Sequence, residues 1–498
     1  MLKGFERNIS ALNILNAEQM EALHRGAMEV LASTGIVVKH TKALKACEEH
    51  GCKVDFEEQR VKIPTWLVEE SLRKCPSSYT IKARDPQNDV RIGGNTMYFL
   101  QGMGMRIVDT ATWETRPATL AEHKQTMIVA DYLPNCHIAD AYEFYMDLEG
   151  IPPIMTFLEG LVSGLRYSSM AEHFGYRRES EVFAIQMAQE LGITLDAELD
   201  IASPLTIYGE CVDAIYRFGE AGMGVWACSG AHLGVAAPAT IAGGIVMQHA
   251  ENCGFITLCQ ILSPGIPVCI EPAGMAVHPR KGHLLVASPQ FALVQAGLFQ
   301  IYRKWEIPLC SVHGYVSDSK MFDFQCGYEK AVGTLLSALT GSNMHIFHGG
   351  NTMELTFSNE MQVLDDDIAG WVGRFIENFA ISNETLGIDV IKECAPHSGA
   401  FLSHPHTINW WMKERFVPLV SDQDAFQEWI QKGKVDILTH TKNKIQEILE
   451  THKPKPLNAR EEEIIDRIMK EAREYYKKQG LISSEEWSLY MKTLKSIY

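Results

Sequence analysis

Several common signatures are missing from this chain of 498 residues. Its twelve cysteines include no CxxC pair, so zinc-ribbon and thioredoxin-type chemistry lack their usual motif. No apolar run reaches the roughly 20 residues that span a bilayer. The N-terminal MLKGFERNIS has neither the apolar core nor the cleavage site of a secretory signal. We therefore expect a cytoplasmic protein that does not insert into membranes.

Positive charge is also scarce. Lysine and arginine number 45 against 62 aspartates and glutamates, which gives a formal net charge of −17. Such a field repels phosphates, so nucleic acid is not an expected partner. A cationic or zwitterionic ligand is not repelled. The 46% of hydrophobic residues is typical of a globular protein with a sizeable core.

From about residue 94, short apolar or β-branched runs alternate with stretches of helical length, as in a parallel sheet. Because eight parallel strands close a barrel, we predict an α/β protein with a (β/α)8 TIM barrel. A doubly wound open sheet is the competing fold, but the first strand is not followed by a useful GxGxxG turn. The eight predicted strands are residues 96–102, 136–145, 161–169, 201–207, 224–230, 266–274, 307–315 and 344–350.

The same alternation predicts three parts of the chain. Residues 1–93 show helical periodicity with a small β element and are expected to form an N-terminal helical cap. Residues 94–384 are assigned to the barrel. Residues 385–498 are expected to form a C-terminal helical extension packed on it, and the alternative for its last amphipathic helix is a docking surface for a partner.

The carboxyl ends of the predicted strands carry mostly aromatic side chains, with a few carboxylates, imidazoles and amides. Active sites of TIM barrels lie at this end. Ring faces attract a cation that has no N–H to donate, so this composition favours a quaternary ammonium ligand, although the same rings alternatively fill the barrel core. The candidates are Tyr98, Phe99, Gln101, Tyr145, Glu271, His313, Tyr315, His348, Asn351 and Phe357.

The segment NMHIFHGGNTMELTF at 343–357 is the most informative. His348 ends a predicted strand, and the two glycines after it let the backbone turn closely around a ligand. A neutral His348 would hydrogen-bond a substrate carboxylate or an ordered water, and the alternative is a structural histidine. Two histidine pairs, 404 with 406 and 345 with 348, lack a third ligand at a recognisable spacing, so we predict no metal.

The stretches CIEPAGMAVHPRKG, SVHGYVSDSKMFDFQCGYEKA and MHIFHGGNTMELTFSNEMQVLDDDIAGW resemble the trimethylamine methyltransferase superfamily. More narrowly, they resemble its pyrrolysine-free members, typified by glycine betaine:corrinoid protein methyltransferase. The resemblance covers nearly the entire chain. It implies transfer of a methyl group from a quaternary amine, such as glycine betaine, proline betaine, carnitine or butyrobetaine, to Co(I) of a separate corrinoid protein. Because pyrrolysine is missing here, trimethylamine itself is not the expected substrate.

Physical chemistry is consistent with a quaternary amine, rather than trimethylamine, as the substrate. A quaternary nitrogen leaves as a neutral amine, so the reaction needs neither a general acid nor a Lewis acid. The chain also lacks the Asp-x-His-x-x-Gly signature that ligates cobalt. The resemblance therefore implies that no cofactor is tightly bound and that the corrinoid arrives on a partner protein. A homo-oligomer is expected as well.

The resemblance leads to a hypothesis for individual residues. His348, helped by Asn351 or Gln101, orients the substrate carboxylate. Glu271 and His313 complete the catalytic candidates and shape the floor or contact the corrinoid. The rings expected to enclose the trimethylammonium group are Tyr98, Phe99, Tyr145, Tyr315 and Phe357.

Two other interpretations stay open. A barrel lyase or hydrolase acting on a small carboxylate would use Glu271 or Glu143 as base and His313 as acid, usually beside a metal or phosphate site. A binding protein that kept the barrel but lost catalysis would hold a betaine without transferring its methyl group.

Overall fold

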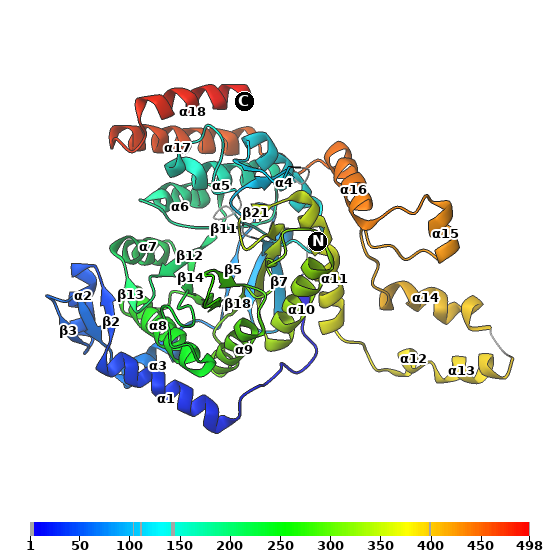
Figure 1. Ribbon diagram of the computed structural model, residues 1–498, viewed down its shortest axis with the longest axis horizontal. Coiled ribbons are helices and arrows are strands. Elements are labelled where there is room, and N and C mark those ends of the chain that lie inside the picture. Colours follow the sequence, from blue (N-terminus) through cyan, green and yellow to red (C-terminus); the bar gives the residue numbers. More distant parts are fainter. Residues whose placement is uncertain (1–3, 103, 110–111, 141–144, 398–399, 498) are drawn as a thin grey trace.

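Eight parallel strands form a closed barrel at the centre of the computed structural model, which describes residues 4–497 except 103, 110–111, 141–144 and 398–399 (Figure 1). The predicted TIM barrel is confirmed. The last strand pairs with the first, and a bridge between Ile270 and Leu309 completes the ring. In spatial order the strands are β7 (Thr96–Gln101), β10 (Ile138–Asp140), β11 (Ala171–Phe174), β12 (Leu195–Ile201), β14 (Gly224–Ser229), β15 (Val268–Pro272), β18 (Cys310–Ser311) and β19 (Met344–His348).

A helix follows each barrel strand. Side chains of Ser, Thr or Asp cap the amino ends of several of these helices, as Asp323 does by accepting from the Cys326 amide. In the described part of the chain, no helix is both long and apolar enough to cross a membrane. The eight helices are α4 (Leu120–Tyr132), α5 (Thr156–Tyr167), α6 (Ser180–Leu191), α7 (Gly209–Glu220), α8 (Ile241–Leu262), α9 (Pro289–Arg303), α10 (Phe324–Thr340) and α11 (Asn359–Ile376).

Two of the predicted strands are wrong. Residues 161–167 belong to helix α5, and the third strand is β11, whose sequence AEHF has two polar residues among four. The fourth strand is β12, Leu195–Ile201, with the sequence LDAELDI. The predicted range 201–207 therefore overlaps it only at Ile201. Neither strand is an apolar run, since β12 turns Asp196 and Glu198 into the barrel and β11 turns in His173, while Glu172 of β11 lies against Gly164 of α5. Residues 141–144 of the second predicted strand lie outside the described residues.

Alternation along the strands separates the barrel interior from its outer wall. Leu100, Ile138, Trp226, Cys269 and Ile346 belong to one apolar cluster inside the barrel. Met97, Phe99 and Phe347 instead pack with residues of α10 and α11. A bulge between Ile346 and His348 shifts the register, so that His348 pairs with Gln101.

The N-terminal part lies on the side and at the amino end of the barrel. Helices α1 (Ala17–Ser33), α2 (Thr41–Glu49) and α3 (Thr65–Lys74) pack on α8. The hairpin of β5 (Ser78–Ile81) and β6 (Val90–Gly93) shares the interior apolar cluster and so fills the amino end of the barrel. The remaining short strands are β1 (Phe5–Glu6), which pairs with β7, and β2 (Ile36–Val38), β3 (Lys53–Asp55) and β4 (Arg60–Lys62), which form a sheet with β13 (Thr206–Ile207).

The C-terminal part divides in two. Helix α16 (Ile437–Thr451) packs on α4 and α11, and α17 (Ala459–Lys478) packs on α6 and precedes α18 (Ser484–Ile497). The segment between α11 and α16 projects away from the barrel (Figure 1), so the expected packing of residues 385–498 on the barrel needs correction there. This projecting arm contains α12 (Asn383–Leu386), α13 (Ile388–Cys394), α14 (Pro405–Glu414) and α15 (Phe426–Gln431).

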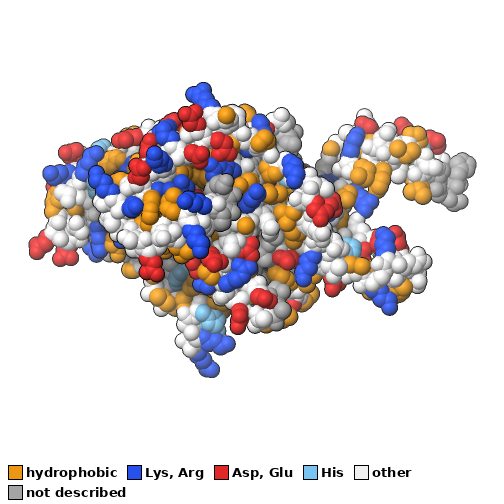
Figure 2. All heavy atoms as spheres, turned by 90° about the horizontal axis from the view of Figure 1, so that it is seen from above, with side chains coloured by type: hydrophobic (Ala, Val, Ile, Leu, Met, Phe, Trp, Pro, Cys, Tyr) orange, Lys and Arg blue, Asp and Glu red, His pale blue; other side chains and the backbone are white. Residues whose placement is uncertain are grey.

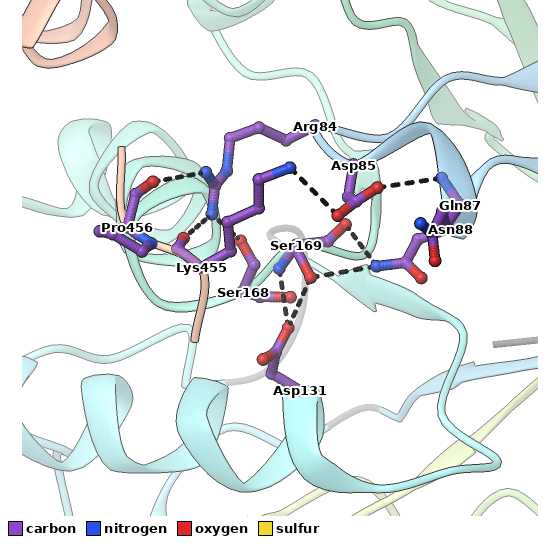
Figure 3. A network of polar contacts seen from close by, with 9 residues as sticks. All are labelled: Arg84, Asp85, Gln87, Asn88, Asp131, Ser168, Ser169, Lys455 and Pro456. Carbon is purple, nitrogen blue, oxygen red and sulfur yellow. Dashed lines mark hydrogen bonds and ion pairs between the residues drawn. The ribbon is translucent and has the colours of Figure 1, made fainter. Parts of the chain in front are cut away.

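A polar network fastens the linker between α16 and α17 to the amino end of the barrel (Figure 3). The Arg84 guanidinium donates to the main-chain oxygens of Ser168 (2.9 Å), Pro456 (3.2 Å) and Lys455. The Lys455 ammonium lies 3.1 Å from a carboxylate oxygen of Asp85. The turn of the β5–β6 hairpin thus holds both the α5–β11 loop and the C-terminal linker.

Candidate active site at the barrel mouth

The deepest polar layer of the barrel interior is centred on Asp196 of β12. Its carboxylate accepts hydrogen bonds from the Tyr79 hydroxyl (2.8 Å) and Trp226 Nε1 (2.5 Å), and His173 Nδ1 lies 2.8 Å away. The His173 ring stacks on the Trp226 ring with centroids 3.9 Å apart. This carboxylate is fully satisfied, so the layer is a structural floor for what lies above it.

The next layer toward the mouth is formed by Glu198, Cys228 and Glu271, which lie on the neighbouring strands β12, β14 and β15. One ligand atom of each lies within 4.8 Å of those of the other two. Glu198 and Glu271 are buried, and Cys228 is partly buried. Among the described residues, neither carboxylate oxygen of Glu271 has a hydrogen-bond partner. A buried acid without partners is rare, and here it faces two other groups able to hold a cation.

The electrostatics around Glu271 are one-sided. Burial is the largest cause that raises the pKa of Glu271 well above its usual range, followed by the charges of Asp200, Asp140 and Glu354. Burial also raises the pKa of Glu354 to about 7. Two ionised carboxylates within 4.8 Å repel each other by roughly 3 kcal/mol at an effective dielectric constant of about 20. Protons or a bound cation would relieve this repulsion.

Acidic side chains continue from this layer toward the carboxyl end of the barrel. Asp200, two residues beyond Glu198, is exposed. Glu354 lies on the turn between β20 (Gly350–Asn351) and β21 (Thr356–Phe357). Three successive residues of this turn, Thr352, Met353 and Glu354, have left-handed φ angles of 51°, 54° and 70°. Such a run is costly for residues with side chains, and strain of this kind gathers at functional sites.

The structure brings three of the predicted site residues into the barrel interior. Glu271 is one of the acidic triad. Tyr315 belongs to the interior apolar cluster, and its buried hydroxyl has no hydrogen-bond partner among the described residues. Tyr98 belongs to the same cluster, but its hydroxyl accepts from the main-chain N–H of Arg91 (3.3 Å), next to the hairpin at the amino end. Of these three interior residues, Glu271 and Tyr315 lie nearer the mouth than Tyr98.

Three other predicted residues lie on the outer wall, facing α11. Gln101 donates to the side chain of Gln362 (3.0 Å), and His348 Nε2 lies 3.5 Å from the carboxylate of Asp366. The Phe99 ring packs against the His348 ring with centroids 6.2 Å apart. These residues meet one another but do not share the interior with Glu271.

The last four predicted residues lie around the rim or between helices. The Tyr145 and Phe357 rings meet edge to face at 5.3 Å, and Phe357 lies so close to Gly349 that a Cβ there would be 2.2 Å from the ring. Cys326 Sγ is 3.7 Å from the Asn351 side-chain oxygen. His313 Nε2 lies 3.3 Å from the Ser288 main-chain oxygen between α9 and α10, where burial lowers the pKa of its ring.

Lys330 of α10 is a buried residue that sequence reasoning missed. Its ammonium lies 3.1 Å from Asp365 and donates to the main-chain oxygens of Tyr315 (2.6 Å) and Gly350 (2.9 Å). It thereby joins the loops that follow β18 and β19. A lysine surrounded by helical sequence gives no sign of such contacts.

Sequence reasoning also missed the acids of β12. The signal was present as the alternation of Asp196, Glu198 and Asp200 in LDAELDI, which places three carboxylates on one face of a strand. Cys228 and Asp140 follow the same inward alternation in their strands. Glu143, a candidate base of the lyase alternative, lies outside the described residues.

Comparison with known proteins identifies the family. Residues 1–475 match the family model for trimethylamine methyltransferase (MTTB). The chain belongs to this family. It is 28% identical over 458 residues to a glycine betaine methyltransferase of Desulfitobacterium hafniense, covering 90% of this chain and 94% of that protein. It is 27% identical to the trimethylamine methyltransferase MttB of Methanosarcina thermophila, covering 90% and 95%.

The fold of this trimethylamine methyltransferase family member is similar to that of a solved structure. The monomethylamine methyltransferase MtmB of Methanosarcina barkeri aligns with a TM-score of 0.51 at 11% identity, covering 92% of this chain and 88% of that one. At this identity the likeness concerns the fold alone. The family assignment makes the protein a methyltransferase and displaces the lyase and hydrolase interpretation.

Proposed function

We propose that this methyltransferase transfers a methyl group from a quaternary amine, glycine betaine or a related betaine, to the reduced cobalt of a separate corrinoid protein. The observation that carries the proposal is the acidic layer at the barrel mouth. The strongest charges acting on Glu271 are all carboxylates, and Glu271 itself has no hydrogen-bond partner among the described residues. Such a layer attracts a permanent cation that needs no hydrogen bond.

The carboxylates would provide affinity and orientation rather than proton transfer. A quaternary nitrogen departs as a neutral amine, so no acid has to protonate it. The remaining demands are alignment of one N–methyl bond with the mouth and exclusion of water, because displacement between a cation and an electron-rich nucleophile is faster in a dry site. The buried interior wall formed by the cluster around Tyr315 suits the second demand.

The residue roles divide accordingly. Asp200 and Glu354, which lie nearer the rim than Glu271, would face the cation, and the Tyr315 ring would contact its methyl groups. His348 and Phe357 would act as positioning residues that hold the wall and the β20–β21 turn in place. The corrinoid is proposed to reach the site on a partner protein that docks over the carboxyl ends of the strands.

The test is a methyl-transfer assay with purified enzyme, its corrinoid protein and a reductant, scanned over glycine betaine, proline betaine, carnitine, butyrobetaine and trimethylamine. We expect one betaine to be demethylated with release of the tertiary amine. Glu354→Gln should raise KM for that betaine several-fold, whereas the exposed cap variant Glu48→Gln should not. Demethylation of trimethylamine alone would refute the proposal, and betaine binding without transfer would favour the inactive homologue.

We also propose that copies of this chain associate through the projecting arm. Among residues 377–440 whose burial is described, only Cys394 and Val420 are buried. Figure 2 shows apolar side chains gathered on the projecting lobes, and Leu402 is 85% exposed. Helices of 4–10 residues are unstable without packing. A largely apolar groove of about 820 Å³ is lined by α10, α11, residues 416–423 of the arm itself and the start of α16, and Trp371 in it is half exposed. This groove offers such packing to the short helices of an arm from another copy.

A further inference from the structure

We propose that Glu198, Cys228 and Glu271 bind a divalent metal ion of the zinc type inside the barrel. The three residues come from adjacent strands β12, β14 and β15, and their ligand atoms lie within 4.8 Å of one another. The independent sign of a ligand is Glu271, which is fully buried with both oxygens unpartnered among the described residues. The sequence predicts no metal, because its histidine pairs lack a third ligand, and the spacing of Glu198, Cys228 and Glu271 along the chain matches no common metal motif.

The spacing of the three groups distinguishes a metal ion from an ammonium group. Zinc bonds of about 2.0–2.3 Å in a tetrahedron separate ligand atoms by roughly 3.3–3.8 Å. A trimethylammonium group keeps carboxylate oxygens about 4–5 Å from its nitrogen, so oxygens on opposite sides lie roughly 8 Å or more apart. Ligand atoms held within 4.8 Å therefore fit a bare ion between them, and a quaternary nitrogen would lie above them, nearer Asp200 and Glu354.

The donor set selects the kind of ion. A cysteine thiolate favours zinc and similar borderline-soft metals over magnesium and calcium, which take oxygen ligands. Three protein ligands leave at least one coordination position open, as in catalytic rather than structural zinc sites. A divalent ion would also offset the charges that Glu198 and Glu271 carry when both are ionised.

The ion would also give the substrate an anchor, a role that rests on the proposed function. A betaine carries a carboxylate, which the acidic layer by itself repels. A divalent ion at the triad would accept a carboxylate oxygen in its open position, while the ammonium end points toward Asp200 and Glu354 nearer the rim. This arrangement leaves an N-methyl group facing the barrel mouth, and it assigns the anchoring role to the ion rather than to His348 on the outer wall.

The experiment uses the purified full-length protein and Co²⁺ as a spectroscopic probe. We expect about one equivalent of tightly bound metal per chain and, after exchange with Co²⁺, a thiolate-to-cobalt charge-transfer band in the near ultraviolet. Cys228→Ser should abolish the band. Glu271→Gln should weaken Co²⁺ binding roughly 100-fold or more, since loss of outer-shell partners alone costs about 10–100-fold. Cys310→Ser, another interior cysteine outside the triad, should leave both unchanged.

Circular dichroism shows whether each variant is folded. If Cys228→Ser is unfolded, the loss of Co²⁺ affinity in Glu271→Gln tests the site instead. Absence of the charge-transfer band in the wild type, or a band that survives in Cys228→Ser, would overturn the metal site. Wild-type KM for the betaine in metal-free enzyme would overturn the anchoring role while leaving the proposed function intact. Metal binding without any betaine demethylation would refute the proposed function and leave the site.

Discussion

At the scale of single residues, two buried carboxylates of the barrel interior differ in their hydrogen bonding. Asp196 is held by a tyrosine, a tryptophan and a histidine, while Glu271, one strand step nearer the mouth, has no partner among the described residues. The first arrangement stabilises the fold, because both carboxylate oxygens have donors. The second costs stability and persists where function requires it, so the contrast marks the boundary between scaffold and site.

Another buried carboxylate, Glu251 of α8, gives a prediction for pH dependence. It accepts from the Leu205 amide (2.8 Å) and the Ser203 hydroxyl (2.9 Å), and burial raises its pKa to about 7. Because the folded state holds this proton more tightly than the unfolded state, the stability gained below the unfolded pKa is lost as the pH rises through about 7. The loss is on the order of 3 kcal/mol.

Glu251→Gln should remove this part of the pH dependence, since the amide does not ionise. Chemical denaturation at pH 5 and pH 8 measures the difference. The wild type should lose more unfolding free energy between the two values than the variant does, and exposed Glu48→Gln should behave like the wild type. Equal losses in wild type and Glu251→Gln would contradict the assignment.

At the scale of elements, helix α10 approaches the β18 loop closely enough for their backbones to touch. Gly333 of the helix faces Gly314, which has a φ of +84°, and a Cβ on Gly333 would lie 2.5 Å from the Gly314 Cα. This contact lets α10 carry Lys330 into the rim, where it joins the loops after β18 and β19. The position of the loop after β18 therefore depends on glycine, which has no side chain, at both 314 and 333.

Gly333→Ala should lower the unfolding free energy, by about 1–3 kcal/mol for overpacking, less the up to about 1 kcal/mol that alanine adds to a helix. Gly327→Ala on the same helix is the matched control, because nothing lies within 4 Å of its added Cβ. That variant should be as stable as the wild type or slightly more so. Urea denaturation of both variants provides the measurement. If Gly333→Ala is as stable as the wild type, the loop after β18 moves aside without cost and the prediction is wrong.

At the scale of the whole molecule, the arm and the barrel mouth lie at different ends. Helix α11 begins after the mouth strand β19 and ends at Ile376, whose main-chain oxygen accepts from Asn8 near the amino end of β7. The arm therefore departs from the end opposite the site. The first part of the arm thus leaves the mouth free, while the groove between copies extends to the starts of α10 and α11 at the mouth end.

Leu402→Asp combined with Trp411→Asp should reduce the oligomer to monomers by placing charges in an apolar contact. Light scattering coupled to size exclusion measures the mass. Phe56→Asp, an exposed apolar residue of the cap, is the control and should keep the wild-type mass. A monomeric wild type, or an unchanged mass in the double variant, would refute the role of the arm.

The amino-acid sequence by itself determined the barrel, because alternating strand-like and helix-like runs need no knowledge of distant contacts. It also determined the acidic character of the protein and carried its family resemblance along nearly the whole chain. It failed at β11 and β12, whose polar inward side chains break the apolar pattern. Those strands hold His173, Asp196 and Glu198, so the places where the pattern failed are the ones that build the site.

Tertiary structure alone decided which side chains meet. A shift of one residue in register turns every side chain of a strand to the other face, and the bulge before His348 directs that ring to α11 instead of the interior. The acidic triad likewise exists only because three strands, separated by two helices in the chain, lie side by side in one barrel. Spacing along the sequence cannot reveal such a meeting, since it depends on strand order and tilt rather than on any local preference.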